Sequence, residues 1–245
     1  MYDVRFYKGN YRWRQLQANR DRCAAYVEHH FNASASSTSG YSVVVTGYNA
    51  SSTSQKWGRW YANRVGKVFN VPVAGKGGLL IGGYNGRGNG NLKHTDMPAI
   101  LLEPLFVSNP QHAAWVRSED GQDKLAKILA DSIIEFFPDG SRVGFSVGHK
   151  YKSSRTSDRG AAVYGGGTEA DYAEIVMEKA KVILEKYDPK RQTITPPQTT
   201  EEEDVPDNDI RVIKDGKELW VYKDIDEDDY ITWDEVNRIL YIKTE

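Results

Sequence analysis

The chain has 245 residues, which is enough for one sizeable hydrophobic core and a small additional unit. Its 32 Lys and Arg residues nearly balance its 34 Asp and Glu residues, so the composition argues against a nucleic-acid-binding surface and a polybasic membrane surface. The only cysteine, Cys23, cannot form an intramolecular disulfide framework or a cysteine-based zinc knuckle. Any metal must therefore be held by histidines and carboxylates.

The polarity of the chain gives an expectation for where the protein is made. Residues 1–15 are too polar and too charged for a signal peptide, and no apolar run approaches the length of a membrane span. We therefore expect cytoplasmic synthesis without a signal peptide, and no membrane insertion.

The first part of the chain predicts alternating strands and helices. In chain order, its hydrophobic periodicity indicates a strand, a helix, two strands and a second helix, over residues 2–7, 13–25, 26–31, 42–46 and 54–69. In both helices apolar side chains recur at helical spacing, as on the buried face of an amphipathic helix.

The next part of the chain continues this alternation. After a Gly-rich loop, the sequence predicts a strand, an amphipathic helix, a strand and a long helix, over residues 99–103, 120–137, 143–147 and 168–187. Thr168 is a suitable N-cap for the last of these helices. Strands that alternate with helices predict an α/β fold, with a mostly parallel twisted sheet flanked by helices.

The composition changes after residue 188. Residues 189–208 are rich in proline, threonine and acidic residues, which is typical of a linker between a domain at 1–188 and a smaller unit at 209–245. Within that unit, "IRVIKDGKELWVY" predicts a β-hairpin with its turn at Asp215-Gly216. We expect a small β-rich ββα module that targets the protein or mediates self-association.

An acidic segment of this C-terminal unit has the spacing of a calcium-binding loop, with candidate ligands at Asp224, Asp226, Asp228 and Glu235. However, Asp229 stands where such loops require glycine, and the segment before the loop resembles a strand instead of a helix. A module without calcium is therefore the favoured interpretation, and calcium binding stays open.

Three predicted strands carry a titratable side chain at the same end. His30 lies at the end of "YVEHHF", Glu103 closes "AILLE", and His149 directly follows "VGFSV". Because functional groups gather beyond the carboxyl ends of parallel strands, we expect these side chains to meet at one edge of the sheet. Glu169 adds a carboxylate in the first turn of the long helix. Two imidazoles and one carboxylate are a common zinc ligand set in hydrolases, and a further carboxylate is then free to act as the general base.

Other candidate residues have less specific interpretations, because a single histidine is more often structural than a metal ligand. His29 should face the opposite side of its strand from His30, which indicates a structural or surface role. His94 is a candidate substrate contact or an ordinary loop residue, whereas His112 is expected at the surface. The Gly-rich loop of residues 82–90 matches no phosphate-binding motif and is expected to be a flexible loop near the cleft.

Two segments resemble the zinc-dependent N-acetylmuramoyl-L-alanine amidases of bacterial cell-wall hydrolases and phage endolysins. "RQLQANRDRCAAYVEHHFNAS" is similar to that family's Arg/Asn-rich helix and the Ser-Ile-His-Ala-Asn-Ala strand after it, which places His30 at the metal-binding histidine. "MPAILLEPLFVSNPQHAAWV" is similar to the family's segment of Pro-Ala-Val-Leu-Val-Glu followed by Gly-Phe-x-Ser-Asn. This second resemblance is the more specific one and places Glu103 at the catalytic glutamate.

The elements with which that family normally begins are found here past the middle of the chain. The family opens with a strand ending in Gly-His-Gly, an Asp-Pro-Gly-Ala-like loop and a metal-binding glutamate at a helix start. Gly148-His149-Lys150, Asp158-Arg159-Gly160-Ala161 and Thr168-Glu169-Ala170 resemble these three elements in the same order, with Lys150 and Arg159 as departures. The resemblance therefore implies a circularly permuted domain over residues 1–188, joined through "PDGSRV".

The resemblance also implies a function. Zinc would be held by His30, His149 and Glu169, with Glu103 as the proton acceptor. The substrate would be bacterial peptidoglycan, cleaved between N-acetylmuramic acid and L-alanine of the stem peptide by a phage endolysin or a mother-cell lysis enzyme. Two alternatives stay open: a zinc peptidase that cuts another stem-peptide bond, and an inactive wall-binding or virion structural protein.

The permutation carries a geometric expectation. If the site is built within one chain, the long helix should end close to Tyr2. The side chains of His30, Glu103, His149 and Glu169 should then converge around one metal. A swapped dimer, in which His149 and Glu169 of one chain complete the site of another, is the alternative. The sequence leaves the oligomeric state open.

Overall fold

The computed structural model describes residues 1–188 throughout and, beyond them, four strands at 210–214, 217–221, 230–234 and 239–243. The chain divides into two compact units, Met1–Gln192 and Thr193–Glu245. In the part of the chain that is described, no helix combines the length and the apolar character of a membrane span.

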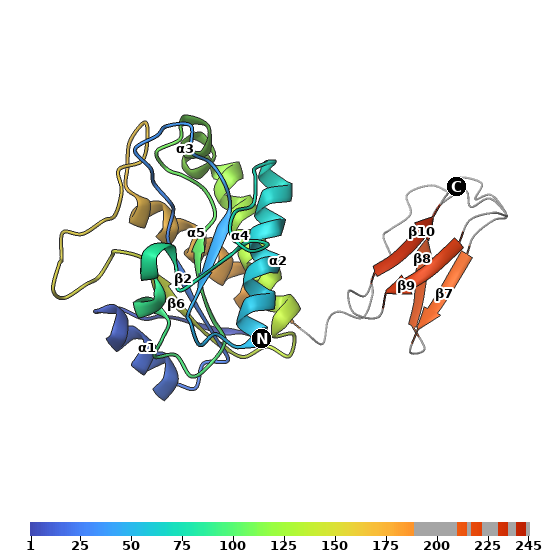
Figure 1. Ribbon diagram of the computed structural model, residues 1–245. Coiled ribbons are helices and arrows are strands. Elements are labelled where there is room, and N and C mark those ends of the chain that lie inside the picture. Colours follow the sequence, from blue (N-terminus) through green and yellow to red (C-terminus); the bar gives the residue numbers. More distant parts are fainter. Residues whose placement is uncertain (189–209, 215–216, 222–229, 235–238, 244–245) are drawn as a thin grey trace. The chain divides into compact units, whose positions relative to one another are not determined.

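The first unit is built around a six-stranded sheet (Figure 1). In chain order, its strands are β1 (Asp3–Phe6), β2 (Ala25–His29), β3 (Val43–Thr46), β4 (Leu79–Ile81), β5 (Ala99–Glu103) and β6 (Arg142–Val147). Across the sheet the order is β1-β6-β2-β5-β3-β4. The first four of these run parallel to one another, β3 runs antiparallel to β5, and β4 is parallel to β3. The prediction of a mostly parallel sheet is confirmed.

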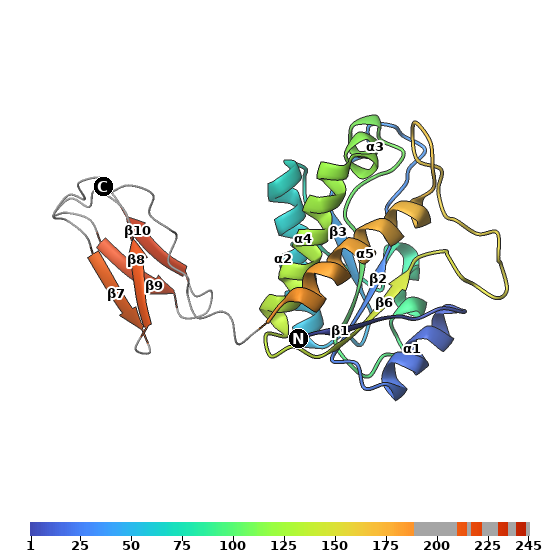
Figure 2. The same ribbon diagram turned by 180° about the vertical axis from the view of Figure 1, so that it is seen from behind.

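Helices cover both faces of this sheet (Figures 1 and 2). They are α1 (Tyr11–Arg20), α2 (Ser52–Phe69), α3 (Pro110–Arg117), α4 (Glu119–Phe136) and α5 (Glu169–Lys186), with short 3-10 turns η1 (Tyr84–Gly86) and η2 (Asn89–Asn91). On one face α4 packs between α2 and α5, whereas α1 lies against η2 on the other. The predicted α/β architecture with flanking helices is therefore confirmed.

Alternating strand residues build one hydrophobic cluster on each face of the sheet. In β2, Val27 belongs to the larger cluster with α2, α4 and α5, whereas Tyr26 belongs to the smaller cluster with Ala18 of α1. In β5, Leu102 lies in the larger cluster and Leu101 in the smaller one. Because successive strand residues point to opposite faces, a sheet covered on both sides needs strands that are apolar throughout.

The first helix differs from the prediction in its length and in its buried face. α1 ends at Arg20 instead of residue 25, and Arg22 then takes a left-handed conformation with φ of 55°. The helix buries Arg14 and Gln15, whereas Trp13 is 55% exposed. These polar side chains are tolerated inside because both donate hydrogen bonds to backbone carbonyls of adjacent segments.

The end of α5 lies next to the start of β1. The rings of Tyr2 and Tyr187 have their centroids 5.6 Å apart, and Figure 2 shows the N-terminus beside the last turn of α5. This is the closeness that a permuted domain within one chain requires. The permutation itself stays a prediction.

The second unit contains two antiparallel strand pairs, β7 (Ile210–Lys214) with β8 (Lys217–Val221) and β9 (Tyr230–Asp234) with β10 (Ile239–Lys243). The first pair is the predicted hairpin, since Lys214 pairs with Lys217. The described residues after it form strands instead of the helix of a ββα module, because the β-branched and aromatic residues of "YITWD" favour a strand. The turn at 215–216 and the calcium candidates at 224, 226, 228, 229 and 235 lie outside the described residues.

Candidate metal centre

Three neighbouring strands place the candidate metal-binding and catalytic side chains at one edge of the sheet. β6, β2 and β5 are adjacent and parallel, so their carboxyl ends meet. His149 lies beyond the end of β6, His30 follows β2, and Glu103 closes β5. The first residue of α5, Glu169, reaches the same place, where its Oε1 atom lies 3.0 Å from Nδ1 of His30 and 3.4 Å from Nε2 of His149.

These three side chains form a group with metal-ligand geometry. One ligand atom from each of His30, His149 and Glu169 lies within 4.8 Å of the other two. Glu169 is only 4% exposed, and the two imidazole rings meet edge to face with their centroids 4.9 Å apart. The structure thus brings together the three residues predicted as zinc ligands, although 139 positions separate His30 from Glu169.

Two glycines allow this close approach. Gly148 packs against the ring of His30, and a Cβ atom at this position would collide with that ring. Gly160 has a φ of 71°, and a Cβ atom there would collide with the carboxylate of Glu169. Glycine fits both positions because it has no Cβ atom and tolerates positive φ. His149 also has a positive φ, of 61°, where the chain turns after β6.

Each candidate histidine ligand is held by a carboxylate at its outer nitrogen. Nε2 of His30 lies 2.9 Å from Oε1 of Glu28, and Nδ1 of His149 lies 3.0 Å from Oδ1 of Asp158. A carboxylate that accepts a hydrogen bond from one ring nitrogen fixes the tautomer, so that the other nitrogen presents its lone pair to a metal. Both inner nitrogens face Glu169, so the three candidate ligand atoms converge on one place.

Glu28 is itself held by a buried polar network. Asn91 of η2 donates a hydrogen bond to Oε1 of Glu28 at 2.5 Å, and Ser146 of β6 donates to Oε2 at 3.2 Å. Arg14 of α1 donates in turn to Oγ of Ser146 at 2.7 Å. The network therefore connects α1, β6 and the Gly-rich loop to His30.

The supporting role of Glu28 was missed in the sequence, although a signal was present. Alternation along β2 places Glu28 on the same face as His30. A carboxylate in a fully buried strand is costly unless it is paired, so Glu28 indicated a buried partner. Asp158 gave no comparable signal, because it lies in a polar loop.

The carboxylates around the group favour a positive charge at its centre. Burial disfavours the charged form of His30, but hydrogen bonds with Glu169 and Glu28 outweigh this effect and raise its pKa to about 10. Burial would also raise the pKa of Glu169, yet its hydrogen bonds with His149 and His30 lower that pKa well below the usual range. A cation bound by imidazole and carboxylate therefore suits the electrostatics of this place.

Glu103 lies beside the group as a separate carboxylate. Its Oε2 atom accepts a hydrogen bond from Nδ2 of Asn32 at 2.9 Å. Burial is the main reason that the pKa of Glu103 is raised, while the nearby charge of His30 opposes the shift and that of Glu169 reinforces it. A buried carboxyl group with a raised pKa near a metal centre suits proton transfer.

The remaining histidines lie outside this group. His29 is fully buried with its ring 5.0 Å from that of Phe31, which agrees with a structural role. The expectation of a surface position for His112 is wrong, because this residue is 5% exposed and its Nδ1 atom accepts a hydrogen bond from the backbone N–H of Phe106. His94 lines a cavity beside the start of α1.

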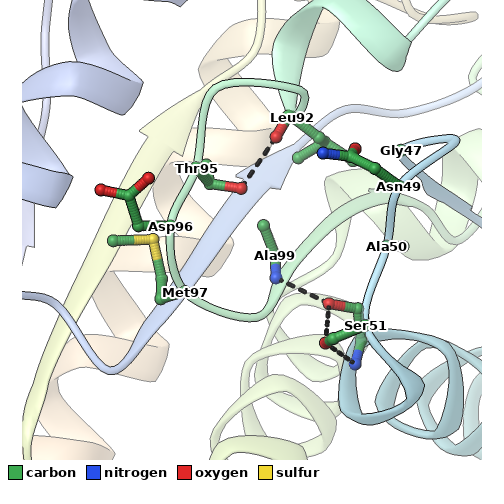
Figure 3. Close-up of a pocket in the computed structure, with 10 residues that line it drawn as sticks. Gly47, Asn49, Ala50, Ser51, Leu92, Thr95, Asp96, Met97 and Ala99 are labelled. Carbon is green, nitrogen blue, oxygen red and sulfur yellow. Dashed lines mark hydrogen bonds between the residues drawn. The ribbon is translucent and has the colours of Figure 1, made fainter.

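A small cavity lies at the opposite end of β5 (Figure 3). It has a volume of about 90 Å³, and its lining includes Ser51 at the start of α2 and Asp96 just before β5. Ala99, which also lines it, begins β5, whereas Glu103 ends this strand. The cavity therefore lies away from the metal-ligand group.

Comparisons with known proteins identify relatives of this chain. A family model described as N-acetylmuramoyl-L-alanine amidase matches residues 7–135. Among solved structures, the chain is similar to the catalytic domain of CwlV, an N-acetylmuramoyl-L-alanine amidase from Bacillus (Paenibacillus) polymyxa var. colistinus. The identity is 26% over 53% of this chain and 66% of that chain, with a TM-score of 0.41.

Two further solved structures show a comparable similarity. For the N-acetylmuramoyl-L-alanine amidase from Clostridium difficile 630, the identity is 19%, the coverage 53% of this chain and 66% of that chain, and the TM-score 0.45. For Ami1 from Mycobacterium smegmatis, these values are 21%, 50%, 57% and 0.43. The chain thus spans less than two thirds of each of these structures. No curated protein sequence matches it.

The family match includes two of the four candidate site residues, which are His30, Glu103, His149 and Glu169. Residues 7–135 make up more than half of the chain and contain both His30 and Glu103. This chain therefore belongs to the N-acetylmuramoyl-L-alanine amidase family.

Proposed function

We propose that this protein is a zinc-dependent peptidoglycan amidase that cleaves the amide bond between N-acetylmuramic acid and L-alanine of the stem peptide. The observation that carries the proposal is the convergence of His30, His149 and Glu169 beside Glu103, in a chain whose family is named for this reaction. In the proposed site, His30, His149 and Glu169 hold the metal and Glu103 transfers the proton.

The residues fit zinc in their chemistry and in their surroundings. Two imidazoles and one carboxylate are a ligand set that leaves a coordination position open in catalytic zinc sites. The carboxylates of Glu28 and Asp158 on the outer nitrogens are the supporting contacts that zinc-bound histidines typically have. When bound, zinc supplies Lewis-acid polarisation of a water molecule and of the scissile carbonyl group.

In the proposed reaction, Glu103 transfers the proton and Asn32 orients Glu103. Glu103 takes a proton from the attacking water and later gives it to the leaving amine of L-alanine. Its raised pKa favours the second of these steps, since a carboxyl group that holds its proton more firmly stays a usable acid near neutral pH. Asn32 fixes the orientation of the Glu103 carboxylate through its hydrogen bond.

We also propose that the domain is circularly permuted. The family match ends at residue 135, before β6, His149 and Glu169. The segment that resembles the beginning of the family follows that match, and it joins the same sheet between β1 and β2. The contact of Tyr2 with Tyr187 supports the proposal, because permutation needs neighbouring ends.

The experiment is product analysis of purified peptidoglycan digested by the protein. Mass spectrometry should find free L-alanine amino termini with an intact glycan, and Glu103→Gln should lower the rate by about 10²–10⁴-fold while zinc stays bound. Glu178→Gln, on the exposed side of α5, is the matched control and should digest normally. New termini elsewhere in the peptide would instead identify a peptidase, and absence of any digestion would favour an inactive wall-binding protein.

A further inference from the structure

A large open cavity lies between the start of α1 and the loop that follows β6. Its volume is about 490 Å³. Four cationic side chains line it, namely Arg12, Lys93, Lys152 and Arg155. The yellow loop after β6 and the blue helix α1, which contribute to this cavity, are visible in Figures 1 and 2. We call this feature the basic cavity.

The basic cavity has an excess of positive charge. Lys152 pairs with Asp158 at 2.8 Å, but Arg12, Lys93 and Arg155 have no ion pair with any acidic residue among residues 1–188. No Asp or Glu lines the cavity. Since the whole chain has a formal net charge of −2, this concentration of positive charge is local and does not follow from a generally basic composition.

The pKa of His94, which also lines the cavity, is affected by this charge. Its pKa is lowered by burial and, beyond that, by the positive charges of Lys93 and Arg12. These effects agree with a cavity wall in which cations lie near one another without compensating carboxylates. Like charges held together in this way favour an anionic ligand.

One backbone–backbone and one side chain–side chain hydrogen bond hold the two walls of the basic cavity together. The backbone N–H of Gly9 donates to the carbonyl of Tyr151 at 3.0 Å, and the hydroxyl of Ser154 donates to Oδ1 of Asn10 at 3.0 Å. The cations of the loop and those near α1 are therefore presented to the same space.

One carboxylate connects the basic cavity to the metal centre. Asp158 contacts Nζ of Lys152 through Oδ2 at 2.8 Å and Nδ1 of His149 through Oδ1 at 3.0 Å. The wall of the cavity is thus one side chain away from a candidate zinc ligand. An extended peptide advances about 3.3–3.6 Å per residue, so a few residues of a stem peptide are long enough to span a gap of one or two side chains.

We propose that the basic cavity binds the free carboxylates of the stem peptide; this inference rests on the proposed function, because it assigns a subsite to the same substrate. A stem peptide has a carboxylate at its C-terminus and on each acidic residue. Arginine and lysine side chains are the complementary partners of such groups. The cavity thereby selects the peptide side of the substrate and aligns its first amide bond with the metal centre.

The first test measures binding without cleavage. In a Glu103→Gln background, calorimetry follows the synthetic peptide L-Ala-γ-D-Glu-L-Lys-D-Ala and the same peptide with both carboxylates amidated. The triple variant Arg12→Gln, Lys93→Gln, Arg155→Gln should bind the acidic peptide about 10-fold more weakly or worse, since each exposed ion pair accounts for roughly 2- to 5-fold. The amidated peptide should bind weakly and equally to both proteins.

The matched control removes the same charge elsewhere. Lys56→Gln, Arg64→Gln and Lys67→Gln lie on the exposed side of α2, on the other face of the sheet, and should leave peptide binding unchanged. An equal loss in this control, or an acidic peptide that binds no better than the amidated one, would overturn the proposal. Loss of glycerol-phosphate polymer binding in the cavity variant, with peptide binding intact, would overturn it in favour of a phosphate ligand.

The second test uses the active protein and separates this inference from the proposed function. Removing the three cations should raise KM for peptidoglycan and leave kcat nearly unchanged, because they do not touch the reacting atoms. One outcome is that the expected amide bond is cut, but the cavity variant binds the acidic peptide as tightly as its parent protein does. In that case only the cavity proposal is wrong, and the proposed function stands. If a different bond is cut while the acidic peptide still depends on the cavity, the proposed function fails and the anion site stands.

Discussion

Glu28 illustrates how a side chain that does not touch the metal position determines the properties of a ligand. It is 2% exposed and contacts the outer nitrogen of His30 at 2.9 Å. Asn91 and Ser146 hold its carboxylate from two sides. The orientation of the His30 ring is therefore fixed by Glu28 before any metal binds, with Nδ1 directed toward Glu169.

This contact predicts a measurable effect on metal affinity. Glu28→Ala should weaken zinc binding by about 10- to 100-fold, because the outer nitrogen of His30 loses its carboxylate. Glu28→Gln keeps a hydrogen-bond acceptor and should lie between Glu28→Ala and the unmodified protein. Competition with a chromophoric chelator measures the affinity, and circular dichroism verifies folding. Glu178→Ala on exposed α5 is the control; a Glu28→Ala affinity within twofold of it would contradict the assigned role.

His112 gives a second prediction at the scale of a residue. Burial lowers its pKa below the ordinary value of 6.5. The stability contributed by the neutral ring is therefore complete above pH 6.5 and is lost as the pH falls through the lower pKa of the folded state. Asn in its place offers an uncharged acceptor to the N–H of Phe106 and cannot be protonated.

We therefore expect the free energy of unfolding to decrease less between pH 7 and pH 5 in His112→Asn than in the unmodified protein. Urea unfolding at three pH values measures this difference. A chelator must be present throughout, so that release of metal from His30 and His149 does not contribute. Parallel pH dependences for the two proteins would show that His112 is not the responsible group.

At the scale of elements, α4 is the central helix of one face. It packs against both α2 and α5, and its apolar side chains form a continuous stripe. Leu129 is fully buried within the larger hydrophobic cluster. The helix begins with Ser118 as an N-cap that accepts a hydrogen bond from Gly121.

Truncation in this stripe should destabilise the domain without altering its chemistry. Leu129→Ala should lower the free energy of unfolding by about 2–5 kcal/mol, because it removes buried methyl groups and leaves a cavity. Glu135→Ala on the exposed side of α4 should change it by less than about 0.5 kcal/mol. Denaturant unfolding gives both values; a Leu129→Ala effect no larger than the control would mean that this position repacks freely.

The loop after β6 and the start of α5 are also joined by charged contacts. Lys150 reaches Asp171 at 2.9 Å and Glu174 at 2.6 Å. Thr168 takes the N-cap position predicted for it, but its hydroxyl donates to Asp171 and makes no capping bond to the backbone. These contacts orient the first turn of α5, from which Glu169 projects.

At the scale of the whole molecule, the candidate site is complete within one chain. His30 comes from the segment covered by the family match, whereas His149 and Glu169 come from the segment after it. Their ligand atoms meet within 4.8 Å without any contribution from a second copy.

A complementation experiment tests this arrangement in solution. We expect mixtures of His30→Ala and His149→Ala proteins to stay inactive on peptidoglycan, since neither chain has a complete ligand set. The unmodified protein should be equally active per molecule at high dilution, where any dimer dissociates. Recovered activity in the mixture would instead demonstrate a swapped dimer that shares His149 and Glu169 between chains.

The sequence by itself determined the layers of the fold and most of its elements. Apolar strands such as "AILLE" and the stripes of α2, α4 and α5 are local patterns, set by neighbours a few residues apart. Strand ends that bear histidine or glutamate likewise indicated where His30, Glu103 and His149 lie. For α1 the local pattern failed, because buried hydrogen bonds of Arg14 and Gln15 replaced an apolar face.

Only the tertiary structure decided which distant groups support one another. Glu28 meets Asn91 across 63 positions and Ser146 across 118, and neither pairing has a periodicity that a sequence displays. The basic cavity likewise joins residues near 12, 93 and 155 that are unremarkable one by one. Such contacts depend on the order of strands in the sheet, which places β6 beside β2, and on loops whose path follows from packing instead of local propensity.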